Sequence, residues 1–101
     1  MTIKLTYDQA KALEHLFINV INPEEPADVA EKLVKHLMTA IFKKLRNKLE
    51  SKVKDGYSLA LTDTEAMAYY IYFQQRHLGL GWLYEQNFID RHILELDKQY
   101  A

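Results

Sequence analysis

The stretch Leu59-Ala60-Leu61-Thr62-Asp63-Thr64-Glu65-Ala66-Met67-Ala68-Tyr69-Tyr70-Ile71-Tyr72-Phe73 is the segment around which the rest of the chain is organised. It begins as a short alternating run, which is typical of a half-buried strand. Thr62 is followed three residues later by Glu65, the spacing of a capping box, in which each side chain bonds one unpaired amide at a helix start. Residues 66–73 form the longest apolar run in the sequence. The stretch therefore predicts a short strand that leads directly into a central helix.

Residues 3–12 repeat the pattern of residues 59–68 position for position. The shared pattern is apolar, any residue, apolar, Thr, two of any residue, Gln or Glu, Ala, any residue, Ala. Coincidence between two ordinary helix starts would also produce this match. Because a short strand is not stable alone, we expect residues 3–5 and 57–61 to pair as a two-stranded ribbon.

The composition is that of a globular protein. The chain has 101 residues, of which 49% are hydrophobic and 27% charged, and it contains no cysteine. A disulfide framework and a thiolate zinc site are excluded, and a reducing compartment is compatible with the sequence. The longest apolar run is too short to span a membrane, and the N-terminus lacks the pattern of a signal peptide. We therefore expect residues 1–101 to form a single cytoplasmic domain without a membrane partner.

Helical spacing and turn signals predict a mainly α fold with four helices around the third, accompanied by the minor ribbon. The expected helices cover residues 6–21, about 27–54, 62 to about 77, and about 82–100. Two closely spaced prolines in residues 22–26 separate the first two helices. Gly56 is the expected left-handed cap of the second helix, and the glycines of residues 78–82 mark a turn before the last one.

The second helix is long for a domain of this size. A helix over residues 27–54 would measure roughly 40 Å, whereas a compact domain of this length has a diameter of very roughly 34 Å. Its apolar stripe thins beyond Phe42 to one residue in four. We therefore expect the helix to overhang the body, to kink, or to pack on a second subunit.

No motif for catalysis or cofactor binding stands out. Cysteine is absent, no phosphate-binding loop occurs, and the Gly79–Gly81 pair lacks the third glycine of a dinucleotide fingerprint. No Glu-x-x-His pair occurs, although His92 and Glu95 have the reverse order and His77 could approach them. We predict no catalytic, cofactor-binding or metal-binding residue, and a protein that is not an enzyme.

Charge is distributed unevenly along the chain. Residues 31–54 carry eight basic and two acidic side chains, whereas the rest of the chain carries five basic and twelve acidic ones. The row Lys44, Lys48 and Lys52 runs at helical spacing beside the apolar row Leu45, Leu49 and Val53. This segment is the most distinctive surface feature that the sequence predicts.

Two functional hypotheses arise from this segment. The first is a small non-enzymatic protein–protein interaction or accessory domain, a candidate homodimer, with Leu45, Leu49 and Val53 as the apolar interface and lysine stems around it. The alternative is a nucleic-acid-associated protein whose basic residues contact phosphates in a salt-sensitive manner. Its contact residues would be Lys43, Lys44, Arg46, Lys48, Lys52 and Lys54. A solvated face that complements the C-terminal end of the helix dipole would also explain these charges.

Overall fold

The computed structural model of the chain describes residues 1–51, 56–74, 76 and 78–100. Over these residues the fold is mainly α, with four α-helices and one small antiparallel sheet, as the sequence predicts. The elements in order are β1 (Thr2–Leu5), α1 (Tyr7–Leu16), a π-helical turn (Phe17–Ile21), α2 (Val29–Glu50), β2 (Tyr57–Ala60), α3 (Asp63–Gln74), a 3-10 turn (Leu80–Trp82) and α4 (Leu83–Tyr100). The first predicted helix thus comprises α1 and the π-helical turn.

The predicted ribbon is present. β1 and β2 pair antiparallel with Ile3 opposite Leu59 and Leu5 opposite Tyr57. These four side chains are buried while their neighbours along the strands are exposed, as a two-residue period requires. Each strand therefore buries one side on the helices and leaves the other in solvent.

Both predicted capping boxes form. The Gln9 amide donates to Thr6 Oγ1 at 3.1 Å, and the Thr6 amide donates to Gln9 Oε1 at 3.1 Å. In the second box, the Glu65 amide donates to Thr62 Oγ1 at 3.2 Å, and the Thr62 amide donates to Glu65 Oε1 at 2.8 Å. The two strand-to-helix connections therefore have the same local structure because they have the same local sequence.

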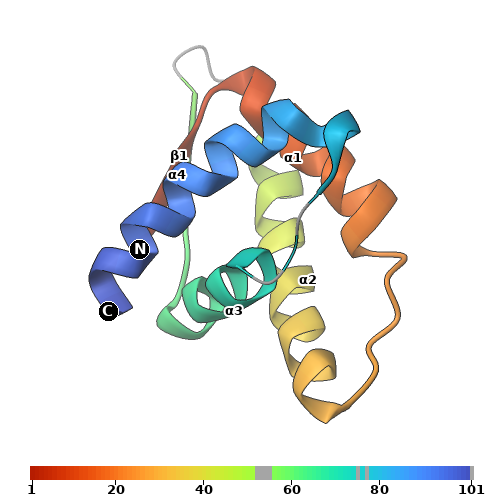
Figure 1. Cartoon of the computed structure of the whole chain (residues 1–101). Coiled ribbons are helices and arrows are strands. Elements are labelled where there is room, and N and C mark those ends of the chain that lie inside the picture. The colour runs from red at the N-terminus through yellow and green to blue at the C-terminus, as the bar shows by residue number, and fades with distance from the viewer. Residues whose placement is uncertain (52–55, 75, 77, 101) are drawn as a thin grey trace.

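Figure 1 shows the arrangement of the four helices. The residues that they bury form a single apolar cluster. The most extensive helix contact is between α2 and α3, and α4 packs on both α1 and α3. Tyr69 of α3 is fully buried at the centre, where its ring meets Phe73 edge-on. The prediction that the helices pack around the third is wrong in part, because α3 packs on α2 and α4 whereas α1 packs on α2 and α4 rather than on α3.

The second helix is shorter than predicted. It ends at Glu50, and Ser51 follows with an extended backbone; residues 52–54 of the predicted helix lie outside the described residues. Gly56 has a positive φ of 93°, but it lies directly before β2 and is not the predicted cap of the second helix, because the C-cap of α2 is Ser51. The third helix ends at Gln74, and residues 75 and 77 of the predicted range also lie outside the description. No helix in the described ranges is both long enough and apolar enough to cross a membrane.

The molecule measures 40 × 29 × 26 Å, and the 22 residues of α2 span about 33 Å of it. The fully buried residues of α2, Met38, Ile41 and Leu45, all lie in its second half. The first turns of α2 extend below the other helices in Figure 1. The end of α2 that is less covered by the other helices is therefore its N-terminal end, where the apolar stripe is richest.

Candidate functional site

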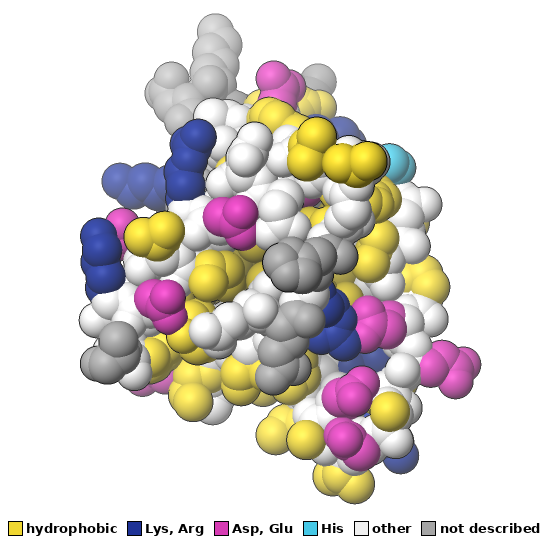
Figure 2. Space-filling view, viewed as in Figure 1, with side chains coloured by type: hydrophobic (Ala, Val, Ile, Leu, Met, Phe, Trp, Pro, Cys, Tyr) yellow, Lys and Arg dark blue, Asp and Glu magenta, His cyan; other side chains and the backbone are white. Residues whose placement is uncertain are grey.

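An exposed apolar surface lies on α2 and α3. Val29 is 80% exposed, Leu33 60%, Met67 47% and Ile71 39%. We call these four residues the α2–α3 surface. In Figure 2, hydrophobic side chains gather along the lower edge of the molecule, below α3 and around the first turns of α2.

The composition of α3 explains its part of this surface. The helix has apolar side chains on nearly all of its faces, and its buried residues face the core and the neighbouring helices. Met67 and Ile71 are four residues apart and so share one side of the helix, on which both side chains are partly exposed. An apolar helix in a four-helix domain of this size thus has more apolar surface than its neighbours can bury.

The α2 and α3 contributions belong to adjacent helices that run in opposite directions. Lys44, in the second half of α2, bonds Glu65 in the first turn of α3. Val34, in the first half of α2, lines the same pocket as Ile71 near the end of α3. Leu33 and Ile71 therefore belong to the same end of the helix pair, and the apolar surface is shared between two helices.

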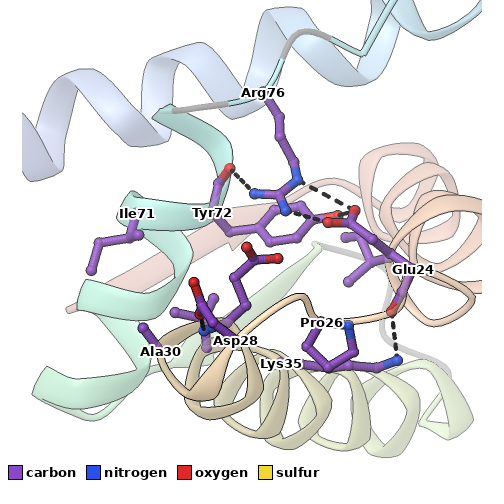
Figure 3. Close-up of a pocket in the computed structure, with 11 residues that line it drawn as sticks. Glu24, Pro26, Asp28, Ala30, Lys35, Ile71, Tyr72 and Arg76 are labelled. Atoms are coloured by element: carbon purple, nitrogen blue, oxygen red, sulfur yellow. Dashed lines mark hydrogen bonds and ion pairs between the residues drawn. The ribbon is translucent and has the colours of Figure 1, made fainter.

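A pocket of about 330 Å³ borders this surface. It lies between the connection that precedes α2, the first turns of α2, and the end of α3 (Figure 3). Its apolar walls come from Ile21, Pro26, Ala30, Val34 and Ile71. The volume falls at the lower end of the range for small-molecule sites, and it suits one large side chain of a partner.

Glu24 organises the polar side of the pocket. Its carboxylate accepts hydrogen bonds from Arg76 and from the Tyr72 hydroxyl, the latter at 2.8 Å, while its backbone oxygen accepts one from Lys35 Nζ at 2.7 Å. The Arg76 guanidinium lies 4.0 Å from the centre of the Tyr72 ring, and Figure 3 shows it stacked there. This network fastens the connection before α2 to both α2 and α3.

The protonation states in this network are fixed by its contacts. Burial raises the pKa of Glu24, but the hydrogen bonds from Arg76 and Tyr72 outweigh it, so the net pKa is lowered. Burial and the neighbouring Glu24 raise the pKa of Tyr72 above its ordinary value. Glu24 is therefore ionised and Tyr72 protonated at neutral pH. Both carboxylate oxygens of Glu24 are already bonded, so this group is suited to structure more than to proton transfer.

Comparison of the chain with protein-family models, curated proteins and solved structures finds no match.

The structure uses part of the predicted basic surface for internal contacts. Lys44 bonds Glu65 and, at 3.1 Å, the Ala60 carbonyl. Arg46 forms an ion pair with Glu14 at 3.2 Å. Lys43 and Lys48 are exposed and form no ion pair with another described residue. Lys52 and Lys54 lie outside the described residues.

The predicted apolar interface is corrected for Leu45. This side chain is fully buried and belongs to the core, so it is not available to a partner in the folded chain. Leu49 is partly buried and packs against the same core, and Val53 lies outside the described residues. The physical reason is that Leu45 follows Met38 and Ile41 at helical spacing, so it lies on the side of α2 that faces the core.

Sequence reasoning did not single out the α2–α3 surface. Val29 and Leu33 belong to an apolar stripe that predicts a side facing the core. Spacing alone does not reveal which end of a long helix the other elements cover. A signal for Met67 and Ile71 did exist, because both lie off the main stripe of the third helix. Among the residues that the structure describes, no group of three His, Asp or Glu side chains could hold a metal ion.

Proposed function

We propose that this chain is a non-enzymatic protein–protein interaction or accessory domain that binds a protein partner through the α2–α3 surface. The observation that carries the proposal is the exposure of four large apolar side chains on two packed helices. Transfer of such side chains from water into an interface stabilises a complex by about 25 cal/mol for each Å² buried. Contiguous apolar patches on soluble domains mark contact sites more often than scattered single residues do.

The surroundings of the α2–α3 surface also support a role in binding a protein partner. The adjoining pocket offers apolar walls to an anchoring side chain, and the Glu24–Arg76–Tyr72 network keeps those walls in place. Acidic and basic side chains border the apolar residues, as in the polar rim of a protein interface. We place this function in the cytoplasm, because the chain has no cysteine.

Site-specific photo-crosslinking in the source cells tests the proposal. A photo-reactive phenylalanine analogue replaces Leu33 in one variant and Leu94 in a control, since Leu94 is 59% exposed on α4, away from the α2–α3 surface. We expect a discrete crosslinked protein from position 33 and none from position 94. Equal or absent crosslinking at both positions would show that the α2–α3 surface has no preferred protein partner.

A further inference from the structure

We propose that the partner of the α2–α3 surface is an acidic amphipathic helix, which packs its apolar stripe on this surface and directs its carboxylates toward a basic row on α2. The row consists of Lys32, His36 and Lys43. An amphipathic helix bound along an apolar surface is a recurring mode of peptide recognition. This inference rests on the proposed function and names the chemistry of the partner.

The basic row lies along the exposed side of α2. Its members are separated by four and seven residues, which places them on one side of the helix. All three side chains are exposed, and none forms an ion pair with another described residue. Residues 32–48 contain six lysine or arginine side chains and no acidic one. A partner that lies along this part of α2 therefore meets no negative charge from the helix itself.

The apolar residues lie between the basic row and α3. Leu33 precedes Lys44, which bonds Glu65 of α3, by eleven residues, close to three full turns, so Leu33 is on the side of α2 that adjoins α3. Lys32 and Lys43 are also eleven residues apart, each one position earlier in the sequence. Their row therefore runs alongside Leu33, about a quarter of a turn farther from α3. A helix that rests on the apolar residues has one border within reach of this row.

The row specifies what the partner must present. It extends over about 17 Å of α2, which corresponds to three turns of a partner helix. The partner needs Asp or Glu along one border of its apolar stripe over those three turns. Apolar contact with Leu33, Met67 and Ile71 supplies most of the affinity, and the charges supply specificity and a faster association.

The pocket carries the opposite charge at the N-terminal end of α2. Glu24, Asp28 and Glu31 line it, and Asp28 and Glu31 form no ion pair with another described residue. The carboxylates of the partner therefore belong beyond the pocket, over residues 32–43. A uniformly anionic surface, such as a bilayer or duplex nucleic acid, would be attracted at one end and repelled at the other. A helix avoids this conflict because its side chains differ from turn to turn.

Designed peptides test the charge of the partner. Three fluorescent helical peptides of about 18 residues, or five turns, share one leucine stripe and differ only in the bordering residues, which are Glu, Gln or Lys. In fluorescence anisotropy, we expect the full chain to bind the Glu peptide at least tenfold more tightly than the Lys peptide, with the Gln peptide between them. High salt should narrow the difference. Equal affinities, tighter binding of the Lys peptide, or no binding of the Glu peptide at about 1 mM would overturn the inference.

Substitutions in the chain test the basic row. Lys43→Glu should weaken binding of the Glu peptide by about three- to tenfold and strengthen binding of the Lys peptide, because the charge contact changes sign. Lys4→Glu is the matched control, since it changes the net charge equally at an exposed position on β1, and it should leave both affinities unchanged. Equal effects of the two variants would assign the attraction to net charge and overturn the role of the row.

A third variant tests the apolar contact. Leu33→Gln adds no charge and should weaken all three peptides by about tenfold, whereas Leu94→Gln, at an almost equally exposed position on α4, should weaken none. Circular dichroism of every variant confirms that the fold persists. A Leu33→Gln variant that binds the Glu peptide as tightly as the unchanged chain would place the peptide elsewhere and overturn the inference.

Lipid vesicles test the competing anionic surface. We expect no co-sedimentation of the chain with phosphatidylserine vesicles beyond that with phosphatidylcholine vesicles. Co-sedimentation with the anionic vesicles alone, combined with equal affinities for the three peptides, would assign the basic row to a membrane and overturn the acidic helix.

The crosslinking experiment separates failure of this inference from failure of the proposed function. In the chain with the photo-reactive residue at position 33, Lys43→Glu should lower the yield of the crosslinked protein by about threefold or more, and Lys4→Glu should not. A crosslinked protein whose yield Lys43→Glu leaves unchanged would exclude an acidic partner, although the interaction function would stand. If position 33 crosslinks to no protein and the peptides bind equally, both proposals fail.

Discussion

Tyr69, which is fully buried, and His92, which is partly buried, form a polar pair between α3 and α4. The Tyr69 hydroxyl lies 2.8 Å from His92 Nδ1. Burial raises the pKa of Tyr69 well above its ordinary value, so the hydroxyl stays protonated within hydrogen-bond distance of the imidazole. Burial also lowers the pKa of His92 to about 4, against a hydrogen bond with the Lys4 backbone that acts in the opposite direction. The neutral imidazole therefore links α3, α4 and β1.

We expect this pair to make the domain sensitive to mild acid. Above pH 6.5, His92 is neutral in both the folded and the unfolded chain, and its contribution to stability is complete. As the pH falls from 6.5 to about 4, only the unfolded chain binds a proton, and the free energy of unfolding should fall by up to about 3 kcal/mol. Urea unfolding at pH 7 and pH 5 measures this change. His92→Gln keeps an acceptor for Tyr69 but does not titrate, so most of this pH-dependent loss of stability should disappear in the variant. An equal loss in the variant would show that other groups cause it.

The three glycines form a graded series at the residue scale. Gly56 has φ of 93°, and a Cβ there would lie 2.8 Å from the Leu5 carbonyl oxygen, whereas Gly79 has φ of 88° but open space around it. Gly81 has neither constraint. We expect alanine to destabilise the domain by roughly 2–3 kcal/mol at Gly56, about 1 kcal/mol at Gly79 and nothing measurable at Gly81. Thermal unfolding of the three variants gives the order, and a Gly56→Ala variant as stable as Gly81→Ala would contradict it.

At the scale of elements, the two capping boxes differ at their last position, which is Gln9 in the first box and Glu65 in the second. Gln9 is partly exposed and serves only the start of α1. Glu65 is buried and also accepts a hydrogen bond from Lys44, so it joins the start of α3 to α2. Burial raises the pKa of Glu65, but the hydrogen bonds from Lys44 and Thr62 outweigh it and the net pKa is lowered. Its contribution to stability is therefore present above pH 4.5 and is lost as the pH falls below that value.

We expect Glu65→Gln to destabilise the domain by roughly 2–3 kcal/mol, because it keeps the capping geometry but leaves Lys44 without its partly buried counter-ion. The matched exchange Gln9→Glu, at the equivalent position of the first box, should change stability by less than about 0.5 kcal/mol. Chemical denaturation at pH 7 measures both. Similar effects for the two variants would mean that the Lys44 contact adds little to the second box.

The elements that the sequence predicted well are those fixed by local chemistry. The repeated Thr-x-x-Gln/Glu pattern located two helix starts and the ribbon that precedes them, because capping is decided within a few residues. The end of α2 and the burial of Leu45 were not predicted, since they depend on where α3 packs. The exposure of Val29 and Leu33 is likewise a property of the assembled fold.

At the scale of the whole molecule, part of the uneven charge of the sequence is neutralised by contacts within the chain. The second half of α2 is basic, but Lys44 and Arg46 neutralise Glu65 and Glu14 of neighbouring helices. This arrangement was not predictable from the sequence, because Glu65 and Glu14 lie far along the chain from Lys44 and Arg46. What remains of the predicted basic surface among the described residues is Lys43 and Lys48.

The competing nucleic-acid hypothesis therefore leads to a quantitative expectation. Each phosphate contact contributes about 0.9 to the slope of log affinity against log salt, so two exposed lysines would give a slope of only about 2. We expect no measurable binding of labelled duplex DNA or single-stranded RNA at physiological salt, in a protein with a net charge of −1. Fluorescence anisotropy at low and physiological salt measures this.

The informative variants for this experiment are Lys43→Gln and Lys48→Gln. Lys44→Gln would also break the contact with Glu65, so a loss of binding could not be separated from a loss of stability. Weak binding at low salt that both changes abolish would be an electrostatic association of the kind that exposed lysines give. A slope much steeper than 2 would require further phosphate contacts on this half of α2. Tight binding that persists at physiological salt would favour the nucleic-acid hypothesis over the interaction hypothesis. In that case Leu33→Glu should leave the affinity for nucleic acid almost unchanged.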